Sequence, residues 1–129
     1  MRVYVFQAAL LCEDCGKAIC DQLRNSIQAL HPAFDESDES TYDSDYFPKG
    51  PYADGGGEAD SPQHCDHCHV FLENPLTDDG DKYVRDLAEE FSDPRAQADE
   101  SWEDIAQKAE SNGKLVLAQW IRYYLAYGQ

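Results

Sequence analysis

Cys12-Glu13-Asp14-Cys15-Gly16 and Cys65-Asp66-His67-Cys68 are the two stretches that decide the fold of this 129-residue chain. Two residues between cysteines let one tight turn present both sulfurs to a single tetrahedral ion. Two such turns supply the four ligands of a closed site, which has no open position for catalysis. We therefore predict one structural Zn²⁺ bound by Cys12, Cys15, Cys65 and Cys68. We expect Gly16 to adopt a positive φ in a turn whose amides face the sulfurs.

The two motifs resemble the zinc knuckles of zinc-ribbon and treble-clef proteins. The second motif departs from that pattern because His69 stands where such knuckles commonly have glycine. The 49 residues between the pairs are compatible with one site, since the entropic cost of loop closure grows only logarithmically with loop length. The rest of the chain resembles small, uncharacterised bacterial or phage proteins with paired knuckles, a resemblance that implies no activity.

Three other interpretations of the cysteines and histidines stay open. His64, His67 or His69 can replace a cysteine ligand or hydrogen-bond to one. Cys65-Asp66-His67-Cys68-His69 also matches the haem c attachment pattern, although that interpretation leaves the first cysteine pair without a role. Iron on the four sulfurs would give a rubredoxin-like electron carrier.

The net charge of −16, from 26 acidic and 10 basic residues, limits the partners. Phosphate backbones are repelled by such a surface, so direct nucleic-acid binding is disfavoured. The charge favours a basic protein as the partner, and the alternative is that it serves solubility alone. Three function classes remain. The first is a protein-interaction adaptor or regulator, which is not an enzyme; the second is a DNA-mimicking inhibitor of a basic nucleic-acid-binding protein; the third is a metalloenzyme or electron carrier that uses the Cys/His cluster.

Residues 1–76 are predicted to form a zinc-knuckle module of an α+β protein. Residues 3–10 are rich in β-branched and aromatic side chains and predict a strand. Apolar residues at helical spacing predict a helix over about 17–30, which His31-Pro32 ends. The acidic segment at about 31–63 is expected to be a solvated loop. Residues 70–72 predict a further short strand. Four aromatic residues offer the acidic segment an alternative, attachment to the body of the protein: Tyr42, Tyr46, Phe47 and Tyr52.

Residues 77–129 are predicted to form a helical subdomain packed on that module. Thr77 caps a first helix, Asp93-Pro94 restarts the chain, and helices follow over about 101–111 and 114–127. Asn112-Gly113 separates the last two helices, which we do not interpret as a DNA-reading pair because the second carries few basic residues. The apolar faces are expected to contain Tyr83, Val84, Leu87, Ala88 and Phe91; Trp102, Ile105, Ala106 and Ala109; and Leu117, Trp120, Ile121, Tyr124 and Leu125.

The compartment is inferred from apolar content and cysteine usage. The sequence has no run of eighteen apolar residues, and Leu11 stands where a lipoprotein signal needs a small residue before Cys12. We therefore expect a cytoplasmic protein without a membrane segment, a compartment in which paired cysteines bind metal more often than they form disulfides. Cys20, the fifth cysteine, is expected to be a small buried hydrophobe.

Overall fold

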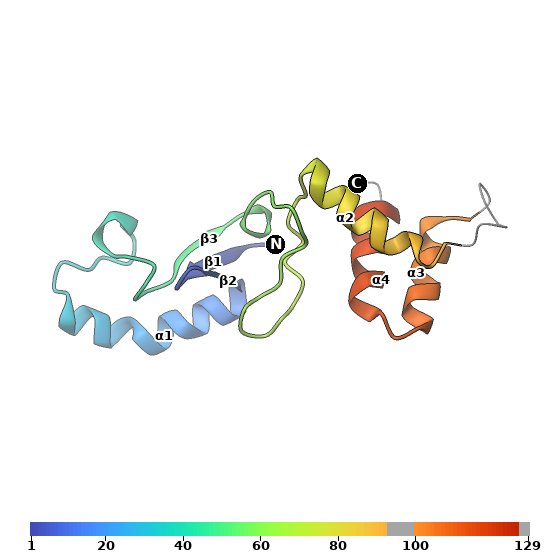
Figure 1. Cartoon of the computed structure of the whole chain (residues 1–129). Coiled ribbons are helices and arrows are strands. Elements are labelled where there is room, and N and C mark those ends of the chain that lie inside the picture. The colour runs from blue at the N-terminus through green and yellow to red at the C-terminus, as the bar shows by residue number, and fades with distance from the viewer. Residues whose placement is uncertain (93–99, 127–129) are drawn as a thin grey trace. The chain divides into compact units, whose positions relative to one another are not determined.

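The computed structural model describes residues 1–92 and 100–126, and it confirms the α+β fold class. The chain divides into two compact units. Unit 1 comprises Met1–Glu58 and Gln63–Pro75, with a three-stranded sheet and one long helix; unit 2 comprises Ala59–Pro62 and Leu76–Gln129 and is helical (Figure 1). That the helical subdomain packs on the first module stays a prediction.

The predicted N-terminal strand is a β-hairpin. Strands β1 (Val3–Phe6) and β2 (Ala9–Cys12) pair antiparallel, with Val3 opposite Cys12 and Phe6 opposite Ala9. Gln7 and Ala8 form the turn with φ values of 51° and 60°. Positive φ at both central residues matches the twist of the flanking strands, but the turn lacks the Asn-Gly or Asp-Gly pair that usually signals it. The prediction of one strand over 3–10 is wrong for this reason.

Helix α1 (Glu13–Leu30) follows β2 without a linker and begins four residues before the predicted start. Cys12 is its N-cap, with the sulfur accepting a hydrogen bond from the backbone amide of Cys15. The helix ends where predicted, at His31 before Pro32. It packs along the hairpin, which places the first cysteine pair where sheet and helix meet (Figure 1).

The expected conformation of Gly16 is wrong, and the reason for glycine there is different. Gly16 is a buried residue in the first turn of α1, with helical geometry. A Cβ at this position would lie 2.1 Å from Cδ2 and 2.4 Å from Cγ of Tyr4 on β1. The missing side chain therefore lets the helix approach the sheet closely.

The acidic segment is ordered, so the expectation of a solvated loop is wrong. It contributes strand β3 (Lys49–Tyr52) to the sheet, in the order β2-β1-β3, and short 3₁₀ turns at Glu39–Thr41 and Asp54–Gly56. Asp35, Asp38 and Asp43 each accept a hydrogen bond from the backbone amide two residues further on. These carboxylates stabilise turns by binding nearby backbone amides. The acidic composition of the segment, and its lack of a regular apolar pattern, did not indicate this order.

An aromatic cluster attaches this segment to the core, as the alternative predicted. The rings of Phe34, Tyr42 and Phe47 meet edge to face with centroids 4.8–5.3 Å apart, and all three are buried. Tyr46 stacks on His31 at 4.9 Å. Tyr52 was also expected to attach the segment, but it is 39% exposed.

Arg24 on α1 fixes the same segment through two hydrogen bonds to the carboxylate of Glu36, at 2.6 and 2.8 Å. This contact keeps the pKa of Glu36 below its usual value, against the opposing effect of burial. The segment is therefore held on α1 by an ion pair as well as by its rings.

Helices α2 and α3 of unit 2 begin at the capping residues that the sequence indicated. Thr77 caps α2 (Asp78–Glu89), and Ser101 and Asp104 form a capping box on α3 (Trp102–Ser111). Gly113 has a φ of 80° just after α3, as favoured at a helix C-terminus. The last predicted helix comprises α4 (Leu115–Ile121) and a π-helical turn (Arg122–Ala126). Asp93-Pro94 lies outside the described residues.

The core of unit 2 confirms most of the predicted apolar faces. Val84 and Ala88 of α2 are fully buried, whereas Tyr83 is 44% exposed and Trp102 is half-buried. The predicted helix residues that are also buried are Ile105, Ala106, Ala109, Ile121, Tyr124 and Leu125, joined by Ala118. Leu87, Phe91, Leu117 and Trp120 are half-buried.

Candidate metal centre

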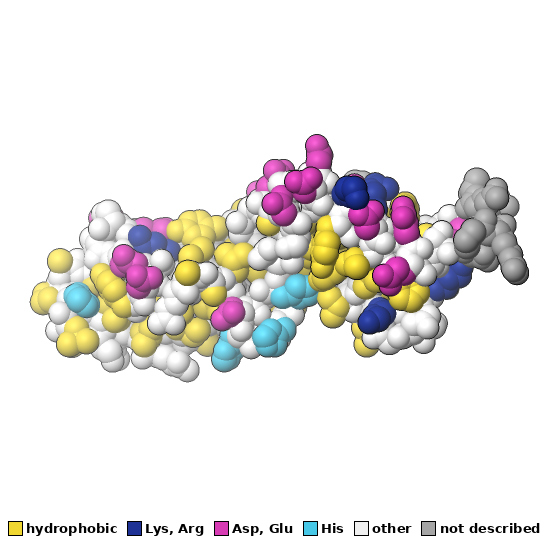
Figure 2. All heavy atoms as spheres, in the orientation of Figure 1, with side chains coloured by type: hydrophobic (Ala, Val, Ile, Leu, Met, Phe, Trp, Pro, Cys, Tyr) yellow, Lys and Arg dark blue, Asp and Glu magenta, His cyan; other side chains and the backbone are white. Residues whose placement is uncertain are grey.

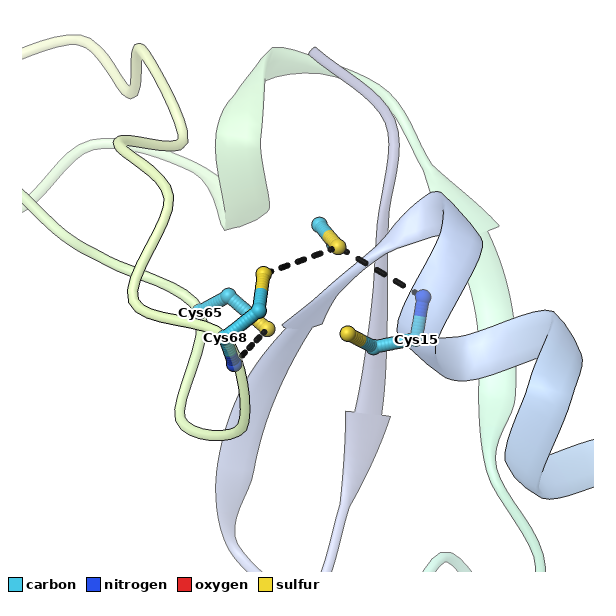
Figure 3. A group of neighbouring side chains, drawn as sticks. Cys15, Cys65 and Cys68 are labelled. Carbon is cyan, nitrogen blue, oxygen red and sulfur yellow. Dashed lines mark hydrogen bonds between the residues drawn. The ribbon is translucent and has the colours of Figure 1, made fainter.

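Four sulfur atoms from two distant segments of unit 1 converge in one cluster. The Sγ atoms of Cys12, Cys15, Cys65 and Cys68 all lie within 4.8 Å of one another (Figure 3). The Sγ atoms of Cys12 and Cys68, 56 positions apart in sequence, are separated by 3.6 Å. A tetrahedral site with zinc–sulfur bonds of about 2.3 Å has sulfur–sulfur edges of about 3.8 Å. The cluster is therefore a four-cysteine group that could hold a metal ion.

The first pair lies at the N-terminus of the 18-residue helix α1. The backbone amide of Cys15 donates to the sulfur of Cys12 at 3.5 Å, and the helix N-terminus carries partial positive charge, which favours thiolates. Glu13, between the two cysteines, is ion-paired with Arg2 at 3.2 Å and with Lys17 at 3.5 Å. Two cations thus offset the charge of a carboxylate that lies between the two cysteines in sequence.

The second pair lies in a tight loop with the hydrogen bonds of a knuckle. The amide of Cys68 donates to the sulfur of Cys65 at 3.5 Å, and the amide of His69 donates to the carbonyl of Cys65 at 2.9 Å. The amide of Cys65 in turn donates to the carbonyl of Val70 at 2.9 Å. The predicted strand at 70–72 is reduced to a single bridge between Phe71 and His64.

His69 occupies the left-handed region with a φ of 67°, which explains why glycine is common there. We expect His69→Gly to raise the free energy of unfolding by about 0.5–1 kcal/mol, because the strain of a left-handed side chain exceeds the entropy that glycine adds to the unfolded chain. Equilibrium denaturation of the metal-loaded protein measures the change. His67→Gly is the matched control, since His67 is also exposed but has no positive φ, and it should stabilise nothing. A loss of stability in the His69 variant would contradict the strain argument.

The knuckle is positioned by contacts that the sequence analysis missed. The amide of Asp66 donates to the carbonyl of Leu10 at 2.8 Å, which attaches the loop to the free edge of β2. Fully buried Asn74 closes the base of the loop, accepting from the amide of Gln63 at 2.7 Å and donating to the carbonyl of Pro75 at 3.1 Å. The Asn-Pro dipeptide, a turn-initiating pair, was the available signal.

The protonation of the cysteines depends on burial and on the surrounding amides. Burial acts to raise the pKa of Cys65, but hydrogen bonds from backbone amides, those of Cys68 and His67 among them, lower it to about 6. Burial raises the pKa of Cys12 and, more strongly, that of Cys15. A cation bound by all four thiolates must therefore displace protons.

Cys20 lies outside the cluster. It is 4% exposed in the core of unit 1, and burial raises the pKa of its thiol to about 11. This confirms that Cys20 is a small buried hydrophobe.

The histidines near the second pair do not belong to the cluster found in the described ranges. Nδ1 of His64 lies 3.0 Å from the carbonyl oxygen of His69, and its ring lies against Phe71, with centroids 5.4 Å apart. His67 and His69 are exposed. Both sulfurs of the second pair lie among those of the first pair, an arrangement that favours a four-sulfur metal site over haem attachment.

No family model, curated protein or solved structure matches the chain in comparisons with known proteins. Within residues 1–92 and 100–126, no helix combines the length and the apolar character needed to cross a membrane.

Proposed function

We propose that this protein is a small acidic zinc-binding adaptor, in which one structural Zn²⁺ is held by Cys12, Cys15, Cys65 and Cys68. The convergence of these four sulfurs within 4.8 Å supports the proposal, because the two pairs together supply all four ligands of a tetrahedral ion. A filled coordination shell leaves no position for substrate, so the metal stabilises the fold and performs no chemistry. Zinc is the preferred ion, since four thiolates in tetrahedral geometry are its common structural ligands.

The charge distribution supports a basic protein as the partner. Seven of the nine lysines and arginines in the described ranges form ion pairs with carboxylates of the same chain. Arg122, one of two basic residues on the last predicted helix, pairs with Glu103 at 3.1 Å and Glu110 at 2.7 Å, so it is not positioned to read DNA. The surface therefore offers a partner mainly carboxylates.

A DNA-mimicking inhibitor is the second candidate. Carboxylates gather over helix α2, whose first turn carries Asp78, Asp79 and Asp81 (Figure 2). Such a row can stand in for phosphates on the surface of a basic nucleic-acid-binding protein. Salt weakens binding to a basic partner in both candidates, so competition separates them: displacement of DNA from the partner by this chain favours the mimic, whereas simultaneous binding of DNA and this chain favours the adaptor.

Elemental analysis of the purified chain, combined with an absorbance spectrum, tests the metal. We expect one zinc per chain and no visible absorbance, because Zn²⁺ has a closed d shell. Removal of the ion by a chelator at neutral pH should lower the melting temperature, since in small sites the free energy of zinc binding is largely free energy of folding. A red iron protein would support the rubredoxin-like carrier, and an unchanged melting temperature after metal removal would contradict the structural role.

A further inference from the structure

The four cysteine residues of the metal centre differ in their exposure to solvent. Cys65 is 0% exposed and Cys12 is 7% exposed, whereas Cys15 is half-buried and Cys68 is exposed. Thiolates held by zinc remain nucleophilic, and the rate of cysteine oxidation depends on thiolate character and exposure. Cys68 is therefore the member of the cluster that a small oxidant from solvent approaches most readily.

A second sulfur lies within reach of the first product. The Sγ atom of Cys12 is 3.6 Å from that of Cys68, and a disulfide bond is about 2.05 Å long. Cys12 lies at the junction of β2 and α1. Cys68 lies in the knuckle loop (Figure 3), so the two sulfurs approach across the site rather than along one turn. Forming the bond requires the two sulfurs to approach by about 1.5 Å, the difference between their 3.6 Å separation and the length of a disulfide bond.

We propose that Cys68 is the oxidation site of this metal centre, where a hydroperoxide forms a sulfenic acid that Cys12 resolves to a Cys12–Cys68 disulfide with release of the zinc. This inference rests on the proposed zinc site. Cys12 and Cys68 would thus have a second role besides zinc binding, the reversible formation of a disulfide.

The two steps balance with hydrogen peroxide as the oxidant. The thiolate of Cys68 attacks one peroxide oxygen, the O–O bond breaks, and hydroxide leaves and is protonated to water. The thiolate of Cys12 then attacks the sulfur of Cys68, the S–S bond forms, and the S–O bond breaks with loss of a second hydroxide, which becomes water. The two sulfurs together lose two electrons, and the peroxide gains two. The ion loses two of its four ligands and dissociates.

The product keeps the chain connected at the same place. Zinc joins the β2–α1 junction to the knuckle loop, and a disulfide between residues 12 and 68 joins the same two segments. Oxidation therefore replaces one cross-link of unit 1 by another, and reduction in the presence of zinc restores the first.

The test adds hydrogen peroxide in increments to the zinc-loaded full chain, with a chromogenic zinc indicator present. Alkylation of the remaining thiols, digestion and mass spectrometry then identify the disulfide. A protease that cleaves before aspartate cuts inside both pairs, at Asp14 and Asp66, so the members of each pair lie on separate peptides. We expect one zinc released per peroxide consumed, a 12–68 cross-link as the first disulfide, and full recovery with dithiothreitol and zinc.

Cys68→His provides an independent readout. Histidine can keep a Cys₃His zinc site but cannot form a sulfenic acid, so zinc release at equal peroxide should slow by at least about tenfold. If this variant fails to bind zinc, the peptide map of the natural chain decides alone. A first disulfide within either pair, or zinc release from the loaded Cys68→His variant at an unchanged rate, overturns the inference. A chain that holds no zinc before peroxide is added refutes the proposed function instead.

Discussion

Cys15→Ser is expected to abolish stoichiometric zinc and to unfold most of unit 1. Serine cannot replace a thiolate ligand, and three sulfurs leave the ion with an incomplete shell. The apparent free energy of zinc binding in small structural sites is about 10–16 kcal/mol. The stability of a typical domain is about 5–15 kcal/mol, so loss of the ion can remove all of it. Zinc content, circular dichroism and soluble yield measure the loss.

Cys20→Ala is the matched control for that substitution. Cys20 lies on the same helix but in the apolar core, so alanine should cost about 1 kcal/mol of packing and leave one zinc per chain. Alanine is a better control than serine, which would place a hydroxyl in the core. Equal loss of zinc from both variants would mean that the ligands are assigned incorrectly.

Gly16→Ala is expected to destabilise the protein by about 3 kcal/mol, although alanine normally stabilises a helix by about 1 kcal/mol relative to glycine. The new Cβ would lie 2.1 Å from Cδ2 and 2.8 Å from Cβ of Tyr4, which is itself only 8% exposed. Because Cβ of Tyr4 is fixed to the backbone of β1, the ring cannot simply rotate away. Helix and strand must separate, and the cysteine N-cap moves with the helix. Denaturant unfolding of the metal-loaded protein measures this loss.

Ser26→Ala on the same helix separates propensity from sterics. Ser26 is exposed and already has a Cβ, so alanine adds no atom there and should be neutral or stabilising by a few tenths of a kcal/mol. If Gly16→Ala were as stable as this control, the close approach of α1 to β1 would not explain the glycine.

The four cysteines illustrate how far local sequence can predict a site. Their spacing is a property of adjacent residues, and it correctly predicted which four sulfurs meet. The caps at Thr77 and Ser101 are local in the same sense, since each side chain bonds to an amide three residues away.

Gly16 and the acidic segment were interpreted incorrectly because their conformations depend on distant parts of the chain. Gly16 is needed because the ring of Tyr4 lies against it, and the acidic segment is ordered by rings that pack on α1 and the sheet. The turn at Gln7-Ala8 adopts positive φ without glycine because the pairing of β1 with β2 requires it.

The sequence by itself determined the four-cysteine group, the fold class and the capped starts of α2 and α3, because spacing, capping and periodicity act between residues a few positions apart. Only the tertiary structure decided that the hairpin and α1 present the first pair, that Asn74 and the edge of β2 hold the knuckle against it, and that Cys68 faces solvent. These features arise from packing between segments up to 56 positions apart. Such contacts leave no periodic signal in the chain.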